Sequence, residues 1–182
     1  EAERIYSEKV QMCTAQESKL ESLKNLAERY EGYGSSIRKI MEQKEKNKGI
    51  HGVVADLISV EKKYETAVET AFGNNIQNIV TDDEQTAKEL IEFLKKNRYG
   101  RATFLPLTGI DEGKKDAPED LSHEKGVIGH AGELIETDSK YRNVINYLVG
   151  RILVVEHIDY AIALQKKYRY SLRIVTPEGE YL

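Results

Sequence analysis

Disulfide chemistry and membrane-spanning segments are both missing from this sequence. Its 182 residues include a single cysteine, Cys13, which excludes an internal disulfide framework and favours a reducing cytoplasm. No apolar run approaches the roughly 18 residues that a membrane helix needs, and no signal peptide opens the chain. We therefore expect a cytoplasmic protein without a membrane partner. The chain starts with EAERIY and stops with EGEYL, both abruptly, which is typical of an excised fragment.

Catalytic and ligand-binding motifs are equally scarce. The histidines are scattered along the chain and form no cluster with metal-ligand spacing: His51, His123, His130 and His157. Cys13 lies within a helical pattern, where a cysteine is expected to pack rather than to react. No glycine pattern typical of a phosphate loop or a dinucleotide site occurs. We expect no enzymatic activity, no cofactor, no metal and no small-molecule substrate.

Charge is abundant but not of one sign. Charged residues make up 32% of the chain and hydrophobic residues 40%, with a formal net charge of -4. The apolar share is sufficient for a core, and the excess of charge indicates long solvated helices. The net charge argues against a uniformly basic nucleic-acid binder. It leaves room for a local basic patch, because nearby charges dominate the local field.

The first 46 residues are predicted to be helical. Apolar residues recur there at coiled-coil spacing, with Gln16 as a polar exception and a break around Gly32 and Gly34. The members of this seam are Cys13, Leu20, Leu23, Ala27 and Tyr30. We interpret residues 1–46 as a segment of a coiled-coil arm. A solvated helix that packs on its own domain is the alternative.

Strand and helix patterns alternate after Gly49. Residues 50–58 are apolar and rich in β-branched side chains, which predicts a buried strand. An amphipathic helix is predicted over residues 61–72, with Ser59 as its N-cap. The pattern then continues with a strand, a capped helix and a further strand: residues 76–80, a helix that starts after Thr81 or Asp82, and residues 101–105.

The same order of patterns occurs a second time. The segment GELIETDSKYRNVINYLVG aligns with ADLISVEKKYETAVETAFG, so that Tyr64 matches Tyr141 and Gly73 matches Gly150. An internal repeat of this kind predicts two similar strand–helix subdomains, which together form an α+β fold.

A polar stretch without periodicity separates the two repeats and predicts a surface linker. We therefore expect four parts along the chain. They are a coiled-coil arm segment (1–46), a first subdomain (49–107), the linker (108–126) and a second subdomain (127–182).

Each repeat ends in a cationic junction between a helix and a strand. The first junction, beside Tyr99, consists of Lys95, Lys96, Arg98 and Arg101. The second junction, beside Tyr168 and Tyr170, consists of Lys166, Lys167, Arg169 and Arg173. Cations of this kind contact phosphates, and neighbouring aromatic rings can stack on unpaired bases. We predict that these eight cations bind DNA, with ordinary solvated helix ends as the alternative.

Two motifs of the first repeat occur together: GIHGVVADLISVEKKYETAVETAFGNNIQNIV and, further on, YGRATFLPL. Joined in this way, they resemble the hinge domain of bacterial structural maintenance of chromosomes (SMC) proteins. The later IVTPEGEYL resembles the segment of that hinge just before its glycine-rich dimerisation stretch. The resemblance covers residues 49–182, and the preceding helix would be the coiled-coil arm that enters the hinge.

This resemblance implies both an architecture and a function. It implies an α+β domain whose two similar subdomains associate, through their sheet edges, with the opposite subdomains of a second copy. Such a homodimer joins two coiled-coil arms with distant ATPase heads, in proteins that condense and segregate chromosomes in the nucleoid. It also implies DNA contact through basic patches near the arm junction. This sequence stops at Leu182, before the glycine-rich stretch and before the returning arm.

Two points stay open from the sequence. Short apolar strands at 101–105 and 152–155 are both candidate edges for pairing with a second copy. A duplicated α/β regulatory or small-ligand-binding domain with an incidental coiled coil would also fit the patterns. A dimeric mass and salt-dependent DNA binding favour the hinge, whereas a monomer that binds a metabolite favours the alternative.

Overall fold

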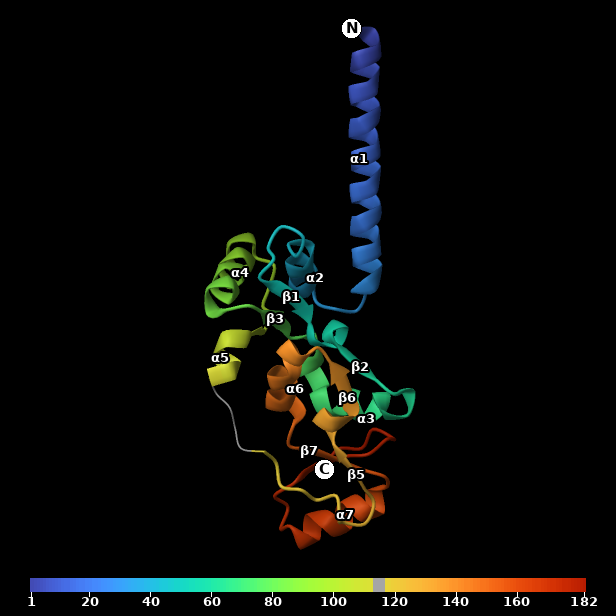
Figure 1. Ribbon diagram of the computed structural model, residues 1–182, viewed down its shortest axis with the longest axis vertical. Coiled ribbons are helices and arrows are strands. Elements are labelled where there is room, and N and C mark those ends of the chain that lie inside the picture. Colours follow the sequence, from blue (N-terminus) through green and yellow to red (C-terminus); the bar gives the residue numbers. More distant parts are fainter. Residues whose placement is uncertain (113–116) are drawn as a thin grey trace.

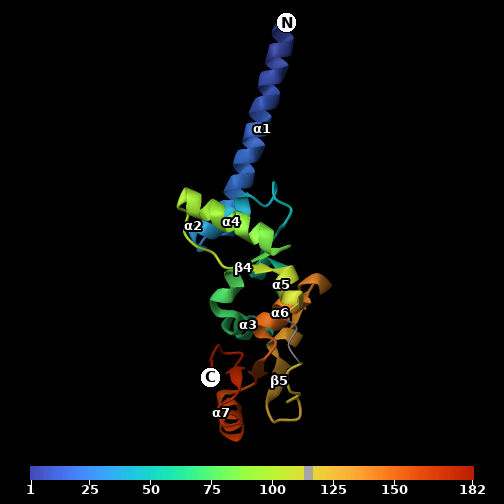
Figure 2. The same cartoon turned by 90° about the vertical axis from the view of Figure 1, so that its left-hand side faces the viewer.

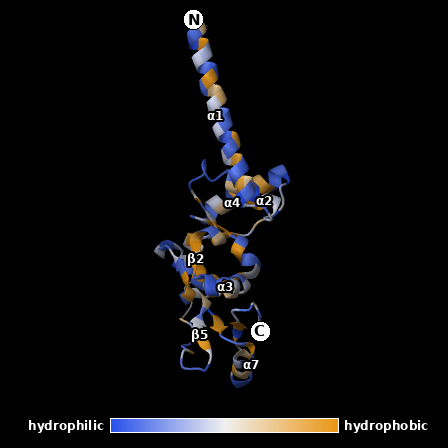
Figure 3. Cartoon of the chain, turned by 90° about the vertical axis from the view of Figure 1, so that its right-hand side faces the viewer, coloured by the Kyte–Doolittle hydropathy of each residue, from blue (hydrophilic) through white to orange (hydrophobic). Residues whose placement is uncertain are grey.

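A long helix and a two-part body make up the molecule (Figure 1). The computed structural model describes the backbone of residues 1–112 and 117–182 and the side chains of 1–110 and 117–182. Helix α1 (Ala2–Arg29) projects from the body and buries none of its residues. Polar and apolar residues alternate along it (Figure 3), and Leu20 on the predicted seam is 69% exposed. No helix in the described part of the chain is long and apolar enough to cross a membrane.

The arm helix ends where Tyr30 enters the core of the body. Tyr30 is only 3% exposed, and the chain then turns through Gly32 at a φ of 90°. Helix α2 (Ser35–Glu42) follows and packs against the body through its apolar face. The predicted helical stretch 1–46 is therefore two helices, of which only the first extends into solvent.

The first subdomain contains a three-stranded sheet. Its strands lie in the order β1–β3–β4, with β1 antiparallel and β4 parallel to the central β3. Helix α4 makes the crossover between the two parallel strands, which such a pair requires. The elements are β1 (Ile50–Val53), β3 (Ile79–Thr81), α4 (Glu84–Asn97) and β4 (Phe104–Pro106).

The second subdomain repeats this arrangement. Its sheet has the order β5–β7–β8 with the same strand directions, and α7 is the crossover helix. Both β1 and β5 shift register just before a glycine, Gly52 or Gly129, whose φ of 140° or 154° favours glycine. The elements are β5 (Val127–His130), β7 (Ile152–Val155), α7 (Ile158–Lys167) and β8 (Arg173–Val175).

The segments between the first two strands of each sheet are also repeated. In the first subdomain they are η1 (Val54–Leu57), β2 (Ile58–Val60), η2 (Lys62–Tyr64), α3 (Glu65–Phe72) and η3 (Gly73–Gln77). In the second they are η4 (Ala131–Leu134), β6 (Ile135–Thr137), η5 (Ser139–Tyr141) and α6 (Arg142–Val149). Tyr64 and Tyr141 end equivalent 3-10 turns, and Gly73 and Gly150 follow equivalent helices. The prediction of two similar strand–helix subdomains is confirmed.

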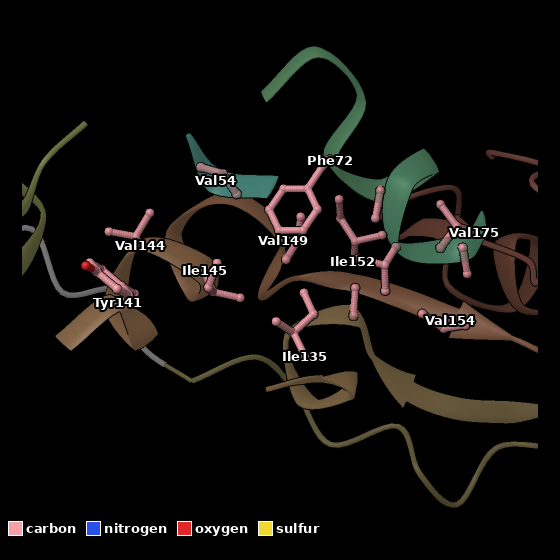
Figure 4. Close-up of a cluster of buried hydrophobic side chains, with 14 of the residues drawn as sticks. Val54, Phe72, Ile135, Tyr141, Val144, Ile145, Val149, Ile152, Val154 and Val175 are labelled. Atoms are coloured by element: carbon pink, nitrogen blue, oxygen red, sulfur yellow. The ribbon is translucent and has the colours of Figure 1, made fainter. Parts of the chain in front are cut away.

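Strands β2 and β6 join the two subdomains. They pair antiparallel, with Ser59 opposite Glu136, and the hydroxyl of Thr137 donates to the Leu57 carbonyl at 2.6 Å. A core with side chains from both subdomains surrounds this pair. Figure 4 shows Phe72 of α3 beside Val149 and Ile152 of the second subdomain. The two subdomains therefore share one hydrophobic core as well as each having its own.

Several predicted boundaries within the repeats differ from the structure. Residues 50–58 form β1, a 3-10 turn and the start of β2 rather than one strand, because the chain leaves the first sheet to pair with β6. Ser59 therefore lies in β2 and caps no helix. The helix after β3 is capped by Asp83, whose carboxylate accepts from the Thr86 backbone N–H at 2.8 Å.

The predicted linker contains structure that its polar composition did not indicate. It overlaps helix α5 (Leu107–Glu112), which packs on the shared core, whereas residues 113–116 lie outside the described part. Leu121 is 1% exposed and lies in the core beneath α7, with Leu153 and Leu164. The second half of the linker is therefore anchored to the second subdomain.

This anchoring predicts that Leu121→Ala lowers the free energy of unfolding by about 2–5 kcal/mol, the usual cost of truncating a buried leucine. The matched change Leu20→Ala, on the exposed face of α1, should alter it by less than about 0.5 kcal/mol. Urea denaturation followed by circular dichroism measures both values. Equal small effects would mean that Leu121 does not anchor the linker.

Candidate nucleic-acid interface

The first basic junction is built on the end of α4. The helix buries Leu90 and Leu94 against the first sheet, which directs its last-turn lysines toward solvent. It ends at Arg98, in the left-handed region with a φ of 56°, and the Tyr99 backbone N–H returns to the Leu94 carbonyl at 3.0 Å. Left-handed closure of this kind is usual after a helix, although glycine is the ordinary residue there.

The predicted cations of this junction are all solvent-exposed: Lys95, Lys96, Arg98 and Arg101. None of them makes an ion pair with another described residue. Their charges are therefore not neutralised within the part of the chain that the structure describes. This is the electrostatic condition for binding an anionic backbone.

Helix α2 belongs to this junction, which sequence reasoning missed. The Ser36 hydroxyl donates to the Arg101 carbonyl at 2.7 Å, and the Ser35 hydroxyl to the Tyr99 carbonyl at 3.3 Å. The ammonium of Lys39 lies 5.4 Å from the centroid of the Tyr99 ring. Tyr99 also packs on Phe93 and is half-buried, so the prediction of an open ring for base stacking does not fit it.

The second junction is partly neutralised. The Lys167 ammonium pairs with the Glu124 carboxylate, and the Tyr168 hydroxyl donates to the same carboxylate at 2.7 Å. These two bonds hold the pKa of Glu124 below its usual range. The bond to Glu124 and burial raise the pKa of Tyr168 to about 12. Lys166, Arg169 and Arg173 are exposed cations, so one of the four predicted charges is compensated.

Beyond α7 the chain makes an unusual turn. Arg169 and Tyr170 are consecutive residues with positive φ, at 54° and 59°, where side chains other than glycine are strained. The buried Gln165 side chain donates to the Leu172 carbonyl at 2.7 Å and holds the turn closed. Tyr170 is 72% exposed, and it is the aromatic residue of this junction that is free to stack.

The two junctions do not form one surface. Helix α4 lies at the end of the body from which α1 projects, whereas α7 lies at the opposite end (Figures 1 and 2). The eight predicted DNA-binding residues are therefore two separate clusters. Only the α4 cluster lies at the end of the body from which the arm projects, with α2 between α4 and the arm (Figure 1).

Known proteins share this arrangement of an arm and two subdomains. The flexible hinge domain of SMC proteins matches residues 47–165, which is more than half of the chain. The chain belongs to the SMC hinge family. The Chromosome partition protein Smc of Bacillus subtilis (strain 168) is 41% identical over 166 residues, which cover 90% of this chain and 14% of that protein. The Lactiplantibacillus plantarum protein of the same name is 37% identical over 167 residues, which cover 91% of this chain and 14% of that protein.

Solved hinge structures have the same fold. An asymmetric dimer of the Geobacillus stearothermophilus SMC hinge domain gives a TM-score of 0.78 at 35% identity, with 94% of this chain and 71% of that chain covered. The Pyrococcus furiosus SMC hinge domain gives a TM-score of 0.67 at 33% identity, with 87% of this chain and 81% of that chain covered. The predicted α+β hinge fold is confirmed. This hinge spans only a small part of the curated relatives that it matches.

The histidines of the hinge have structural partners. His51 bonds to the Tyr141 hydroxyl at 2.7 Å through Nδ1 and to the Asp82 carboxylate through Nε2, so it links the two subdomains. The His157 side chain accepts from the Asp159 backbone N–H at 3.3 Å and caps α7. His130 precedes η4, and its backbone N–H donates to the Glu133 carboxylate at 3.0 Å. No group of three or more potential metal ligands occurs among the described residues.

The Glu124 contact predicts a measurable titration. Glu124→Gln should lower the pKa of Tyr168 from about 12 toward its ordinary value of 10.0, because the bonded charge is removed. The matched change Glu119→Gln should lower it less, since Glu119 acts only through its field. Carbon-13 NMR of the tyrosine ring Cζ reports each titration.

The sign of the pH effect follows from the two shifted pKa values. The contact stabilises the folded hinge while Glu124 is ionised and Tyr168 is neutral. Its contribution is lost as the pH falls through the lowered pKa of Glu124, and again as the pH rises from 10 through about 12. An unchanged Tyr168 titration in Glu124→Gln would show that the two side chains are not bonded in solution.

Proposed function

We propose that the chain is the dimerisation hinge of a chromosome-organising SMC ATPase. The observation that carries this proposal is the match to the SMC hinge family, together with a two-subdomain body from which one long helix projects. The hinge joins two coiled-coil arms in chromosome condensation and segregation. It has no chemistry of its own, and ATP is hydrolysed in heads outside these residues. The protein acts in the cytoplasm, associated with the nucleoid.

A homodimer forms through sheet edges in this proposal, and β4 is the edge that the contacts favour. Thr103 accepts from the Ile79 backbone N–H at 2.9 Å, so the N–H and C=O of Phe104 point away from β3. Because Pro106 has no N–H, only a short stretch of this edge can pair. An open groove of about 480 Å³ runs between α4 and β4, and Ile91, 39% exposed, lines it.

The second sheet contributes a different edge. Its central strand is β7, so the expectation that 152–155 is an uncovered edge is wrong. The outer side of β8 is covered by the chain itself, because Ile174 and Leu182 exchange backbone hydrogen bonds at 2.8 and 2.9 Å. Among the described residues, the segment 181–182 therefore lies against β8 on that side. In this proposal, β4 of one copy meets this segment of the other copy, so that opposite subdomains pair. The Geobacillus stearothermophilus hinge, which crystallised as a dimer, supports such an association.

The groove predicts where a charge breaks the dimer. In a polypeptide that carries the whole hinge, Ile91→Glu should weaken self-association by more than about tenfold, because a carboxylate would be buried against the partner. Gln85→Glu adds the same charge to α4 outside the groove and should have little effect. Sedimentation equilibrium at micromolar concentrations measures both. Equal association constants would exclude the groove from the interface.

DNA contact at the arm-proximal junction is the second part of the proposal. Lys95, Lys96, Arg98 and Arg101 are exposed and unpaired within the described chain. They belong to the junction of α4, at the end of the body from which the arm projects. Lys39 of α2 also lies at this junction, but its ammonium is 3.3 Å from the Glu42 carboxylate and is neutralised by it. The distal residues Lys166, Lys167, Arg169 and Arg173 form a weaker site, because Glu124 neutralises Lys167.

Charge reversal tests this ranking. Lys95→Glu with Lys96→Glu should flatten the slope of log affinity against log salt by nearly two units, since each phosphate contact contributes about 0.9. The variant should remain folded, because a negative charge in the last turn of α4 opposes the helix dipole and costs only about 0.3–1 kcal/mol per residue. The matched pair Lys166→Glu and Lys167→Glu should change the slope less. The measurement is a salt titration of DNA binding, with circular dichroism as the folding control. Sedimentation equilibrium is the control for self-association, because Lys95 also lines the groove between α4 and β4.

Two outcomes would contradict this part of the proposal. They are a larger change in the salt slope for the Lys166/Lys167 variant than for the Lys95/Lys96 variant, and an unchanged slope in a folded Lys95/Lys96 variant. Either would mean that the first junction is an ordinary solvated helix end. The alternative of a small-ligand or regulatory domain has no observation in its favour. Binding of a metabolite by a monomeric chain would favour that alternative.

We also propose the domain limits expected from the sequence: an arm segment over 1–46, subdomains over 49–107 and 127–182, and a linker over 108–126. Separate cores around α4 and α7 support the two subdomains. Within the first segment, α2 packs with the first subdomain, so the free arm is α1.

A further inference from the structure

One carboxylate fastens the arm to the body. The Tyr30 hydroxyl donates to Asp56 Oδ2 at 2.5 Å, and Arg29 Nη2 lies 3.3 Å from Asp56 Oδ1. Both oxygens of Asp56 are therefore engaged by consecutive residues at the end of α1. Asp56 itself lies in η1, the short turn between β1 and β2.

This contact is partly shielded from solvent. Tyr30 is almost fully buried, and only 20% of the Asp56 side chain is exposed. Burial and the bond to Asp56 raise the pKa of Tyr30, so its hydroxyl remains a neutral donor at physiological pH. Arg29 is mostly exposed and contributes less, as surface ion pairs do. The Tyr30–Asp56 bond is therefore the principal attachment in this pair of contacts.

The next residue along η1 is bonded to the other subdomain. The Leu57 carbonyl accepts from the Thr137 hydroxyl of β6 at 2.6 Å. At the start of the same turn, the Val54 backbone N–H donates to the Asn78 carbonyl at 2.9 Å, and the Val54 side chain lies in the shared core. Three residues of this four-residue turn thus contact the arm, the residue before β3 and the second subdomain.

We propose that η1 couples the direction of the arm to the relative placement of the two subdomains. Asp56 and Leu57 are adjacent in a single 3-10 turn that the buried Val54 anchors in the shared core, so a displacement of one is passed along the backbone to the other. A change at the β2–β6 seam therefore reaches Tyr30 through η1. The proposal uses contacts within one chain and depends on neither dimerisation nor DNA binding.

The chain has a pivot for such a movement immediately after the arm. Gly32 has a φ of 90°, and nothing lies within 4 Å of the position where a Cβ would be. Tyr30–Asp56 opposes rotation about this glycine, together with the burial of the Tyr30 ring and the bond from the Tyr33 backbone N–H to the Tyr30 carbonyl at 3.0 Å.

Distances between paired spin labels test the coupling. Cys13 is the sole cysteine and is exposed on α1, so it accepts one label without substitution. Gln85→Cys on α4 and Ala163→Cys on α7, both exposed, provide sites on the two subdomains. The distance between labels at 13 and 85 reports the direction of the arm relative to the first subdomain. The distance between labels at 85 and 163, measured in a Cys13→Ser background, reports the relative placement of the two subdomains. Labelled chains are diluted into excess unlabelled chain to suppress distances between copies.

The decisive variant is Thr137→Val, which removes the hydroxyl that bonds to Leu57 and touches no residue of the arm. It should broaden the 85–163 distances and also the 13–85 distances. The population outside the main 13–85 peak should rise roughly fivefold, the equilibrium weight of one hydrogen bond. Tyr30→Phe, which retains the buried ring, should broaden the 13–85 distances to a similar extent.

Matched variants separate coupling from general loosening. Tyr33→Phe removes the hydroxyl of the neighbouring tyrosine, and Thr70→Val removes one that bonds within its own helix. Both should leave the distances unchanged, and Thr137→Ser should restore the wild-type pattern. Arm distances that stay narrow in Thr137→Val, or in Tyr30→Phe, would overturn the proposal, as would equal broadening in the controls. Circular dichroism confirms that each variant is folded.

Discussion

The antiparallel pairing of β2 with β6 is the interaction on which the rest of the body depends. These are equivalent strands of the two repeats, and their central residues, Ser59 and Glu136, face each other. A pair in which equivalent positions meet is what an approximate two-fold relation between the subdomains requires. Two short strands are marginal on their own, so the shared core around Phe72 and Ile152 must stabilise them. The seam and this core therefore form together.

Much of this architecture could be predicted from the sequence because its repeats are long enough to align. Tyr64 with Tyr141, and Gly73 with Gly150, indicated the duplication correctly. The division of residues 50–58 into β1, η1 and β2 could not be predicted. An apolar run looks the same in the sequence whether it forms one strand or two strands joined by a turn. The strand that pairs with β2 is β6, more than seventy residues away.

The candidate site was predictable as a set of residues but not as a surface. Cations in the last turn of a helix are visible in the sequence, and their helices are where they were expected. Their separation to opposite ends of the body depends on how the subdomains are joined. The neutralisation of Lys167 depends on Glu124, 43 residues away in the linker, and the burial of Tyr99 depends on α2. Contacts between distant segments decide these points, and local patterns do not report them.

The length of α1 makes small angles at its base important. Its 28 residues give a rod of about 42 Å, at 1.5 Å per residue. A rotation of about 10° at its base would move the far tip by about 7 Å, which exceeds one turn of helix. A continuous coiled coil would extend this lever in proportion to its length. A single tyrosine–carboxylate bond, together with the packing around it, thus limits how far the remote end of an arm can sweep.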